Sequence, residues 1–352
     1  MSSSTEPRRR AQDPGATPTT SHASASPSSP AVPAATGAPD GTGARERFLA
    51  GVRSGRWLRP VLLANLVAEV VIVITGGVVR LTGSGLGCPD WPTCADGSVT
   101  PVVHQAEGFH KYIEFGNRLL TGPVGLLAVA ALLAVVLLRP PRPRLRVVAL
   151  LPVLGVLVQA VVGGITVHTD LSPITVSAHF LISMALIAVS TLLYLRAGEG
   201  DGDPRPVVPP AVRTLAVALS ATTAAVLVVG TVVTGSGPHS GDADQPARYG
   251  FDPRTVSWLH ADLVLLLVGL LVGLLVALHV APSTPTARRR AWWVLGVVLV
   301  QGLIGYVQYA TDLPVVLVAL HMLGACLLVV AVTALWTSLR ERTDAGVVVP
   351  SR

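Results

Sequence analysis

The sequence predicts an all-α integral membrane protein whose eight transmembrane helices form two parallel four-helix-bundle repeats. Three observations lead to this fold class. Hydrophobic residues make up 51% of the 352 residues and charged residues only 13%, with a mean hydropathy of +0.60, whereas a soluble domain carries about 25% charged residues. Eight apolar segments are long enough to cross a bilayer, and the two halves of the chain share a sequence pattern. The composition excludes an ordinary soluble enzyme, and three cysteines are too few for a disulfide-rich secreted scaffold.

The chain before the first apolar segment has a different composition. Residues 1–45 are rich in Ser, Pro, Ala, Thr and Gly, and such a segment cannot bury enough apolar surface to order itself. No apolar stretch follows Arg8–Arg10, so we expect no cleavable signal peptide. We interpret residues 1–45 as a disordered cytoplasmic tail.

Each predicted helix is a run of about 20 mostly apolar residues, which is the length that crosses the hydrocarbon core. Runs such as Leu126–Leu138 and Leu263–Leu278 are typical only of membrane spans. The predicted spans are residues 58–79, 117–138, 147–167, 174–195, 212–233, 256–279, 291–310 and 315–337. The predicted regions are a first four-helix repeat over 46–196, a cytoplasmic linker over 197–211, a second four-helix repeat over 212–338 and a cytoplasmic tail over 339–352.

Positive charge is distributed unevenly between the segments that connect the spans. With the N-terminus in the cytoplasm, seventeen arginines from Arg45 to Arg342 fall on the inside, and five basic residues fall on the outside. Positively charged segments stay on the cytoplasmic side, so we expect a multi-pass cell-membrane protein with both termini cytoplasmic. The two longest outer loops, about 80–112 and 234–255, are rich in glycine and polar residues, which makes the outer face the predicted working face.

Two stretches of the chain match without a gap. Each has a glutamine, a Thr-Asp-Leu triplet and a histidine in the same order, with 20 residues from glutamine to histidine. Each half also carries Thr-Gly-Ser-Gly after its first span. Because four spans is an even number, both copies have the same orientation, and we expect a pseudo-twofold axis along the membrane normal. The matching residues are Gln159 and Gln301, 169–171 and 311–313, His179 and His321, and 82–85 and 234–237.

Three of the nine histidines, His179, His260 and His321, lie inside predicted spans near their outer ends. An ionisable residue at such a depth is costly and usually functional. Two neutral imidazoles that face each other across a bundle suit a bis-histidine haem iron, whereas zinc requires further ligands. We therefore predict that His260 and His321 bind haem b. The loop histidines, His239 among them, are interpreted as solvated side chains.

The first half differs from the second at the matching positions. Counting back from His179 by the spacing of the second half gives Asn117, which is a poor haem ligand. Three residues earlier stands Glu114, where the second half has Ser257. His110 lies on the same helical stripe if the helix extends that far. The first half would leave one ligand position of the iron open beside a carboxylate, which suits a substrate site. The second half would then hold the cofactor.

The first outer loop contains a cysteine pair. Cys88 and Cys94 flank Pro-Asp-Trp-Pro-Thr. The outer side is oxidising, which favours a disulfide. A metal site is the alternative, although no His or Cys motif of zinc-site spacing accompanies the pair. Cys326 lies in the last span and is interpreted as a packing residue.

These features together resemble one known family, heme A synthase. The resemblance covers residues 58–338 and depends on the segments 76–86, 113–118, 163–167 and 234–242 together with the span histidines. It implies an eight-helix duplicated bundle, a membrane oxidoreductase of haem biosynthesis. Such an enzyme oxidises the C8 methyl of haem O to a formyl group with oxygen from water, and so supplies haem A for cytochrome c oxidase assembly.

The resemblance also implies roles for single residues, with one departure from the family pattern. Many members carry Glu-x-x-His-Arg where this chain has Asn117 in place of the histidine. Either His179 is the sole protein ligand of the substrate iron, or His110 replaces the missing histidine. Glu114 either moves a proton or stabilises positive charge at the methyl carbon. The implied site residues are Glu114 as the catalytic group; His179, Asn117, His110 and Arg118 for the substrate haem; His260 and His321 for the iron of haem b; and Cys88 with Cys94 as a disulfide.

Two other classes of protein compete with this interpretation. A membrane di-haem b cytochrome that exchanges electrons with quinol needs paired histidines in both halves, and Asn117 and Glu114 disfavour it. A transporter with parallel repeats has broken helices and charges near the midplane, whereas the candidate residues here cluster near the outer face. The expected partners are haem O and membrane lipid, and no nucleic acid. Docking to the haem O-forming farnesyltransferase or to terminal oxidase assembly factors, and formation of a homo-oligomer, stay open.

Overall fold

The computed structural model describes residues 41–242 and 246–342. Within these residues the chain forms nine α-helices and one pair of short strands. Eight of the described helices, each of 23–28 residues, are long and apolar enough to cross a membrane, which confirms the predicted all-α integral membrane fold. The elements are α1 (Gly41–Arg53), α2 (Leu58–Leu81), α3 (His110–Val136), α4 (Pro143–His168), α5 (Pro173–Arg196), β1 (Arg205–Pro206), α6 (Pro210–Ser236), α7 (Pro253–Val280), α8 (Pro285–Ala310), α9 (Val315–Thr337) and β2 (Arg340–Glu341).

Proline and polar caps set the starts of the membrane-spanning helices. Proline is the first residue of α4, α5, α6, α7 and α8, a position where its missing N–H costs no hydrogen bond. Asp252 caps α7, because its Oδ2 accepts hydrogen bonds from the hydroxyl and the backbone N–H of Thr255 at 2.7 and 2.8 Å. These bonds hold the pKa of Asp252 below its ordinary value.

Helix α3 begins at His110, seven residues before the predicted start of its span at residue 117. The polar first turns of α3 are held by the preceding loop, since Lys111 Nζ donates to the carbonyls of Val102 and Val103 at 2.6 and 3.0 Å. The apolar run alone did not show this extension. The longer helix places His110 and Glu114 one turn apart on the same face.

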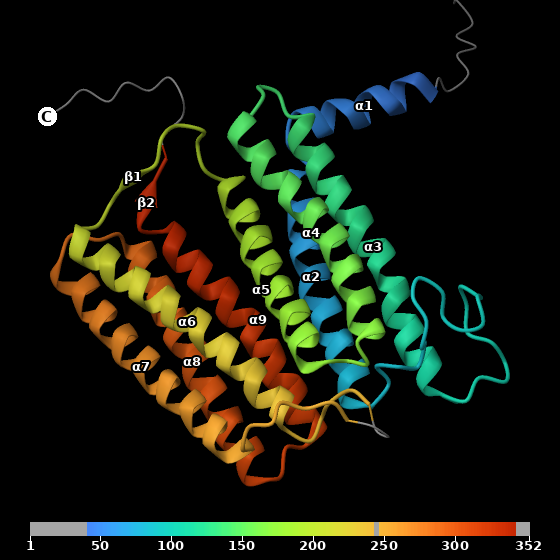
Figure 1. Cartoon of the computed structure of the whole chain (residues 1–352). Helices are drawn as coiled ribbons and strands as arrows, with labels where there is room; N and C mark the ends of the chain where they lie inside the picture. Colours follow the sequence, from blue (N-terminus) through green and yellow to red (C-terminus); the bar gives the residue numbers. More distant parts are fainter. Residues whose placement is uncertain (1–40, 243–245, 343–352) are drawn as a thin grey trace, which may run out of the picture. The chain divides into compact units, whose positions relative to one another are not determined.

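The helices of residues 45–342 form two groups, α2–α5 and α6–α9, which lie side by side (Figure 1). Helices α2 and α5 of the first group pack against α9 of the second, and α5 also contacts α6. Each group has its own buried apolar cluster. A third cluster joins the groups and includes Leu66 and Val73 of α2, Ile187 of α5 and Cys326 of α9, so Cys326 packs as predicted.

The links between α4 and α5 and between α8 and α9 share one backbone form. Asp170 and Leu171 have φ of 48° and 55°, and Asp312 and Leu313 have φ of 57° and 58°. Such left-handed conformations are uncommon for residues other than glycine. The shared Thr-Asp-Leu triplet therefore adopts the same turn in both halves. The pseudo-twofold relation between the halves stays a prediction.

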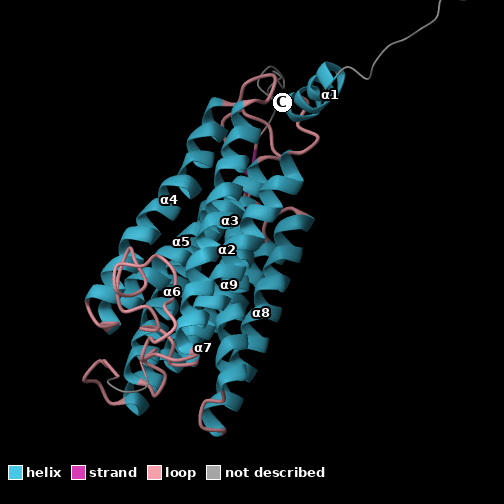
Figure 2. Ribbon diagram, turned by 90° about the vertical axis from the view of Figure 1, so that its right-hand side faces the viewer, coloured by secondary structure: helices cyan, strands magenta, loops and turns pink. Residues whose placement is uncertain are grey.

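The long loops of the two halves meet at one end of the bundle, which we call the disulfide end (Figure 2). Gly85 N donates to Gly241 O at 2.8 Å, and Ser84 pairs with Asp242 in an isolated antiparallel bridge. Gly241 has a φ of 99°, which only glycine adopts readily. At the opposite end, the Arg-rich end, strand β1 pairs with β2 in antiparallel register.

The predicted tails fall partly outside the described residues, which exclude 1–40 and 343–352. Helix α1 begins at Gly41, before the predicted end of the N-terminal tail at residue 45. Its sequence from Ala44 to Leu49 contains Ala, Arg, Glu and Leu, which are good helix formers. The segments predicted as linker and C-terminal tail contribute β1 and β2.

Candidate functional site

His260 of α7 and His321 of α9 face each other in the second half of the bundle. Their ring centroids lie 6.5 Å apart, with an angle of 68° between the ring planes. The Nδ1 atom of each ring is buried and has no hydrogen-bond partner among the described residues. Two imidazoles that bind one iron from opposite sides have centroids about 6 Å apart, given metal–nitrogen bonds of about 2 Å. The observed separation therefore fits a bis-histidine haem site.

Glycines on the two remaining helices of this half face the same rings. A Cβ at Gly230 of α6 would lie 3.1 Å from Cε1 of His260, and a Cβ at Gly305 of α8 would lie 3.6 Å from Cε1 of His321. A Cβ at Gly230 would crowd the ring of His260, whereas a Cβ at Gly305 would make an ordinary van der Waals contact with His321. The backbones of α6 and α8 therefore pack closely against the two rings.

The first half repeats this arrangement with one different side chain. A Cβ at Gly163 of α4 would lie 3.4 Å from Cε1 of His179, and a Cβ at Gly76 of α2 would lie 3.7 Å from Nδ2 of Asn117. The Nδ1 of His179 is buried without a partner among the described residues. Asn117 is not free, because its Oδ1 accepts a hydrogen bond from Thr75 Oγ1 at 2.8 Å. The position that holds a second histidine in the other half is thus occupied by a hydrogen-bonded amide.

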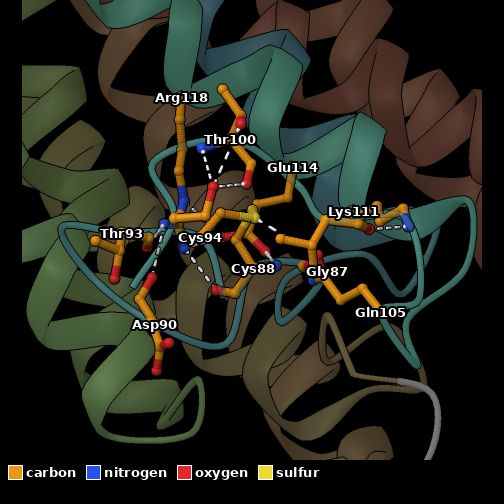
Figure 3. Close-up of a disulfide and its surroundings, with 12 residues drawn as sticks. Gly87, Cys88, Asp90, Thr93, Cys94, Thr100, Gln105, Lys111, Glu114 and Arg118 are labelled. Carbon is orange, nitrogen blue, oxygen red and sulfur yellow. Dashed lines mark hydrogen bonds and ion pairs between the residues drawn. A yellow bond between two sulfur atoms is a disulfide. The ribbon is translucent and has the colours of Figure 1, made fainter. Parts of the chain in front are cut away.

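Glu114 and Arg118 of α3 form an ion pair that is bound to the disulfide loop (Figure 3). Oε1 of Glu114 accepts from Arg118 Nε and Nη2 at 2.9 and 2.5 Å, and its Oε2 accepts from Cys88 N at 2.7 Å. Arg118 also donates to the carbonyls of Cys88, Asp90 and Thr93 at 2.7–3.0 Å. Glu114 is 6% exposed. Because Arg118 holds one carboxylate oxygen and the loop holds the other, the position of the carboxylate is fixed.

The loop that this ion pair holds lies over the first half. Cys88 and Cys94 are joined by a disulfide in the structure, as predicted. Between them, the ring of Trp91 packs on α4 at Gly164, where a Cβ would come within 2.5 Å of Trp91 Cδ2. Only glycine permits this contact. The disulfide loop therefore bridges α3 and α4 above His179 of α5 and Asn117 of α3. These two residues occupy the positions that match the histidine pair of the second half.

His110 lies at the disulfide end and is engaged by Ser84. The His110 Nδ1 and Ser84 Oγ atoms are 2.7 Å apart, and Ser84 also pairs with the second loop at Asp242. His110 therefore connects the two loops at the start of α3. Asn117 lies two turns further into the bundle on the same helix.

Two side chains of unforeseen importance hold the second outer loop, Arg80 from the first half and His239 within the second. Arg80 of α2 donates to the carbonyls of His239 and Thr234 at 2.7 and 3.0 Å. The ring of His239, interpreted from the sequence as solvated, donates from Nε2 to Leu313 O at 3.1 Å. Arg80 stands directly after the apolar run of α2 and within a motif rich in glycine. This position could have indicated from the sequence that Arg80 makes specific contacts. The bonds of Arg80 attach the second loop to the first half, and the bond of His239 attaches it to the link between α8 and α9.

Glu69 in the middle of α2 is a further residue that the sequence analysis passed over. It is 3% exposed, and its Oε1 has no hydrogen-bond partner among the described residues. One turn away, Asn65 Nδ2 donates to Ser190 Oγ of α5 at 3.0 Å. A carboxyl group deep in a membrane span is costly and usually functional. The central place of Glu69 in an apolar run could have indicated this residue from the sequence. Glu69 corrects the expectation that all candidate residues lie near the outer face.

An apolar groove of about 320 Å³ runs between α2 and α3. Its wall includes Ile72, which is one turn from Thr75, and Leu120, which is one turn from Asn117. The groove therefore continues inward from the hydrogen-bonded Thr75–Asn117 pair. Every side chain in its wall is apolar.

The fold and these side chains define an integral membrane protein of eight spanning helices with a pair of facing histidines in its second half. The chain belongs to the COX15-CtaA family, described as cytochrome oxidase assembly proteins, whose model matches residues 59–333.

Several relatives carry the name heme A synthase. The protein from Shewanella oneidensis is 33% identical over 153 residues, which are 40% of this chain and 44% of the relative. The protein from Exiguobacterium sibiricum is 33% identical over 135 residues, 37% of this chain and 44% of the relative. With both, the chain matches less than half of the relative's length. The protein from Sinorhizobium fredii is 25% identical over 334 residues, 80% of this chain and 89% of the relative.

Proposed function

We propose that this protein is a heme A synthase, an oxidoreductase that converts the C8 methyl of haem O into the formyl group of haem A. The observation that carries the proposal is the pair of unlike halves: a facing histidine pair in one, and a single histidine beside a fixed carboxylate in the other. The family and the name of several relatives support it. A di-haem cytochrome is disfavoured because Asn117 replaces the fourth histidine.

In this proposal His260 and His321 hold haem b. Their ring separation of 6.5 Å and their unpartnered Nδ1 atoms support a bis-histidine site. A haem bound there supplies one-electron transfer. The protein's part is to fix the two rings and to keep Gly230 and Gly305 small beside them.

The first half is proposed to bind haem O as substrate, with His179 as the protein ligand of its iron. His110 is engaged by Ser84, which supports His179 as the sole ligand. The isoprenoid tail of haem O requires apolar space beside the site, and the groove between α2 and α3 provides it next to Asn117. A single axial ligand gives weaker binding, which suits a substrate that leaves as product.

Glu114 is proposed as the group that accepts protons during the oxidation. Conversion of a methyl group and one water to a formyl group releases four protons and four electrons. The four electrons must pass to an external oxidant, and the protons require an acceptor at the site. Arg118 and Cys88 N fix both carboxylate oxygens, and the disulfide loop covers this half.

The Arg-rich end is proposed to face the cytoplasm of the cell and the disulfide end the outside. Seventeen of the 22 basic residues in the connecting segments gather at the Arg-rich end, and positively charged segments stay on the cytoplasmic side.

The test is haem extraction and chromatography from cells that supply haem O and express the chain. We expect haem A to appear with the intact chain and to be absent from cells with an empty vector. Absence of haem A, with haem O present and the protein in the membrane, would contradict the proposal.

A further inference from the structure

A cavity of about 680 Å³ lies at the Arg-rich end, where α5 and α9 end and α8 begins. Its wall contains the arginines 290, 340 and 342 together with the hydroxyl-bearing residues Thr284 and Ser338. The volume is within the range of about 300–1,000 Å³ found for ligand sites. The candidate haem sites lie toward the other end of the bundle, so this cavity is separate from them.

Several guanidinium groups here lack acceptors. Arg196, the last residue of α5, is 7% exposed, and its Nε and Nη2 atoms have no hydrogen-bond partner among the described residues. The Nε of Arg340 is also buried without a partner in the described chain. Arginine is always charged and cannot escape the cost of burial by losing a proton. No described residue accepts a hydrogen bond from these donors, and the buried oxygens Glu199 Oε2 and Asp201 Oδ1 at the same end also have no hydrogen-bond partner in the described chain.

The charges around the cavity are unbalanced. Arg196 lies within electrostatic range of Arg340 and Arg342, and its neighbour Ala197 is part of the cavity wall. Burial, together with the nearby charge of Arg340, lowers the pKa of Arg342 below its ordinary value. An anion in the cavity would relieve both the repulsion and the missing hydrogen bonds.

Carboxylates at this end offset only part of the positive charge. Glu199 Oε2 lies 3.6 Å from Arg342 Nε, and Glu341 is also in the cavity wall. Asp201 is paired with Arg142, again at 3.6 Å. The four arginines 196, 290, 340 and 342 against Glu199 and Glu341 leave a net charge of +2.

Tryptophan side chains indicate the depth of the cavity relative to the bilayer. Trp292 and Trp293 of α8 are 55% and 67% exposed, and Trp336 of α9 is 36% exposed. Exposed tryptophans gather at the level of the lipid headgroups. The cavity residues Thr284 and Ser338 lie beyond these tryptophans along α8 and α9, which places the cavity at the headgroup level.

We propose that this cavity binds the phosphate of an anionic phospholipid headgroup. Guanidinium groups bind phosphate through paired hydrogen bonds, and basic pockets between helices at a membrane surface recognise anionic headgroups. The unpartnered Arg196 and Arg340 would donate to the phosphate oxygens, and the hydroxyl of Ser338 would add a neutral donor. The bound lipid would join α5 of the first half to α8 and α9 of the second half at this end.

The test compares lipids of equal chain length on the detergent-purified protein by native mass spectrometry. The probes are phosphatidylglycerol and phosphatidylcholine, with inorganic phosphate as a separate arm. We expect the intact chain to prefer phosphatidylglycerol, and the double variant Arg196→Gln/Arg340→Gln to bind it roughly 30-fold more weakly, at about fivefold for each arginine near an anionic surface. The control variant Arg213→Gln removes an exposed arginine at the same end and should change nothing.

Equal binding of the two lipids by the intact chain would overturn the proposal, as would unchanged binding by the double variant. Inorganic phosphate that binds as tightly as phosphatidylglycerol would overturn the assignment to lipid. If the double variant does not fold, the variant Arg340→Lys keeps the charge and removes the planar guanidinium. It should bind phosphatidylglycerol more weakly than the intact chain, and equal binding would count against the proposal.

Discussion

The two halves of the bundle share a scaffold and differ in one of four facing side chains. In each half, two helices carry a glycine, and each glycine faces a side chain on one of the other two helices. Three of these side chains are histidines, and the fourth is Asn117, which is bonded to Thr75. The first half adds the ion pair of Glu114 and Arg118 and the disulfide loop above it. In the proposed function, one half holds a cofactor by two ligands, whereas the other has one ligand and a carboxylate that takes part in the reaction.

If the proposed function is right, this difference teaches that a duplicated bundle can separate cofactor and substrate by one histidine, one ion pair and one loop. In both halves, glycines let the helix backbone pack closely against the facing side chains. In the proposed function, the halves differ in the number of histidines that bind the iron, and with it in how long the haem stays bound. The following changes break or sharpen this comparison.

The largest effect is expected from loss of the histidine pair. Replacing His260 or His321 with Ala should remove the bis-histidine absorption spectrum of the purified protein, because one ring alone cannot hold a six-coordinate iron. His179→Ala is the matched control in the first half and should leave that spectrum in place. An unchanged spectrum in both second-half variants would contradict the assignment.

Loss of the Glu114 carboxyl should abolish catalysis without emptying the second half. Glu114→Ala removes the proton acceptor and the partner of Arg118, so we expect haem A yield to fall at least about 100-fold. Glu114→Gln keeps the volume and one acceptor oxygen but cannot ionise, and a similar loss would assign the effect to charge. Haem extraction measures both variants, with the haem b spectrum as the internal control. A normal haem A yield from Glu114→Ala would remove this residue from the mechanism.

Substitution of Asn117 should convert the first half toward the second. Asn117→His places an imidazole opposite His179, so we expect haem to stay bound there after purification and product release to slow. Breaking the bond to Thr75 costs about 1 kcal/mol of folding free energy, so Asn117→Ala should be mild. Optical spectra and haem A yield follow both changes. If Asn117→Ala loses as much activity as His179→Ala, then Asn117 is itself a central site residue.

Some features of the fold and of the candidate site could be predicted from the sequence, and others could not. Apolar runs of span length predicted the eight helices, and the spacing of Gln and His predicted that His321 matches His179. The start of α3 was placed too late, because the contacts of Lys111 with its loop are not visible in hydropathy. The bonds of Arg118 to three loop carbonyls, and the cavity around Arg340, depend on segments distant in sequence. Patterns along one helix cannot show such contacts.

The smallest effect concerns how the two halves begin their second helices. Helix α7 has the Asp252 cap, whereas α3 begins without a side-chain cap and is held by its loop. The pKa of Asp252 is lowered in the folded protein, so its stabilising effect is present above its ordinary pKa of about 3.9 and is lost as the pH falls through the lowered value. Asp252→Asn should therefore increase amide exchange in the first turn of α7 at neutral pH and not at pH 2. An equal difference at both pH values would exclude a charge-dependent cap.

The central claim is that one half holds a haem permanently and the other does not. The most direct measurement is the ratio of haem to protein in the intact chain purified from cells that make haem b and no haem O. We expect one haem per chain, with a bis-histidine spectrum that disappears in His321→Ala. Two haems per chain, or one haem that survives that substitution, would contradict the account.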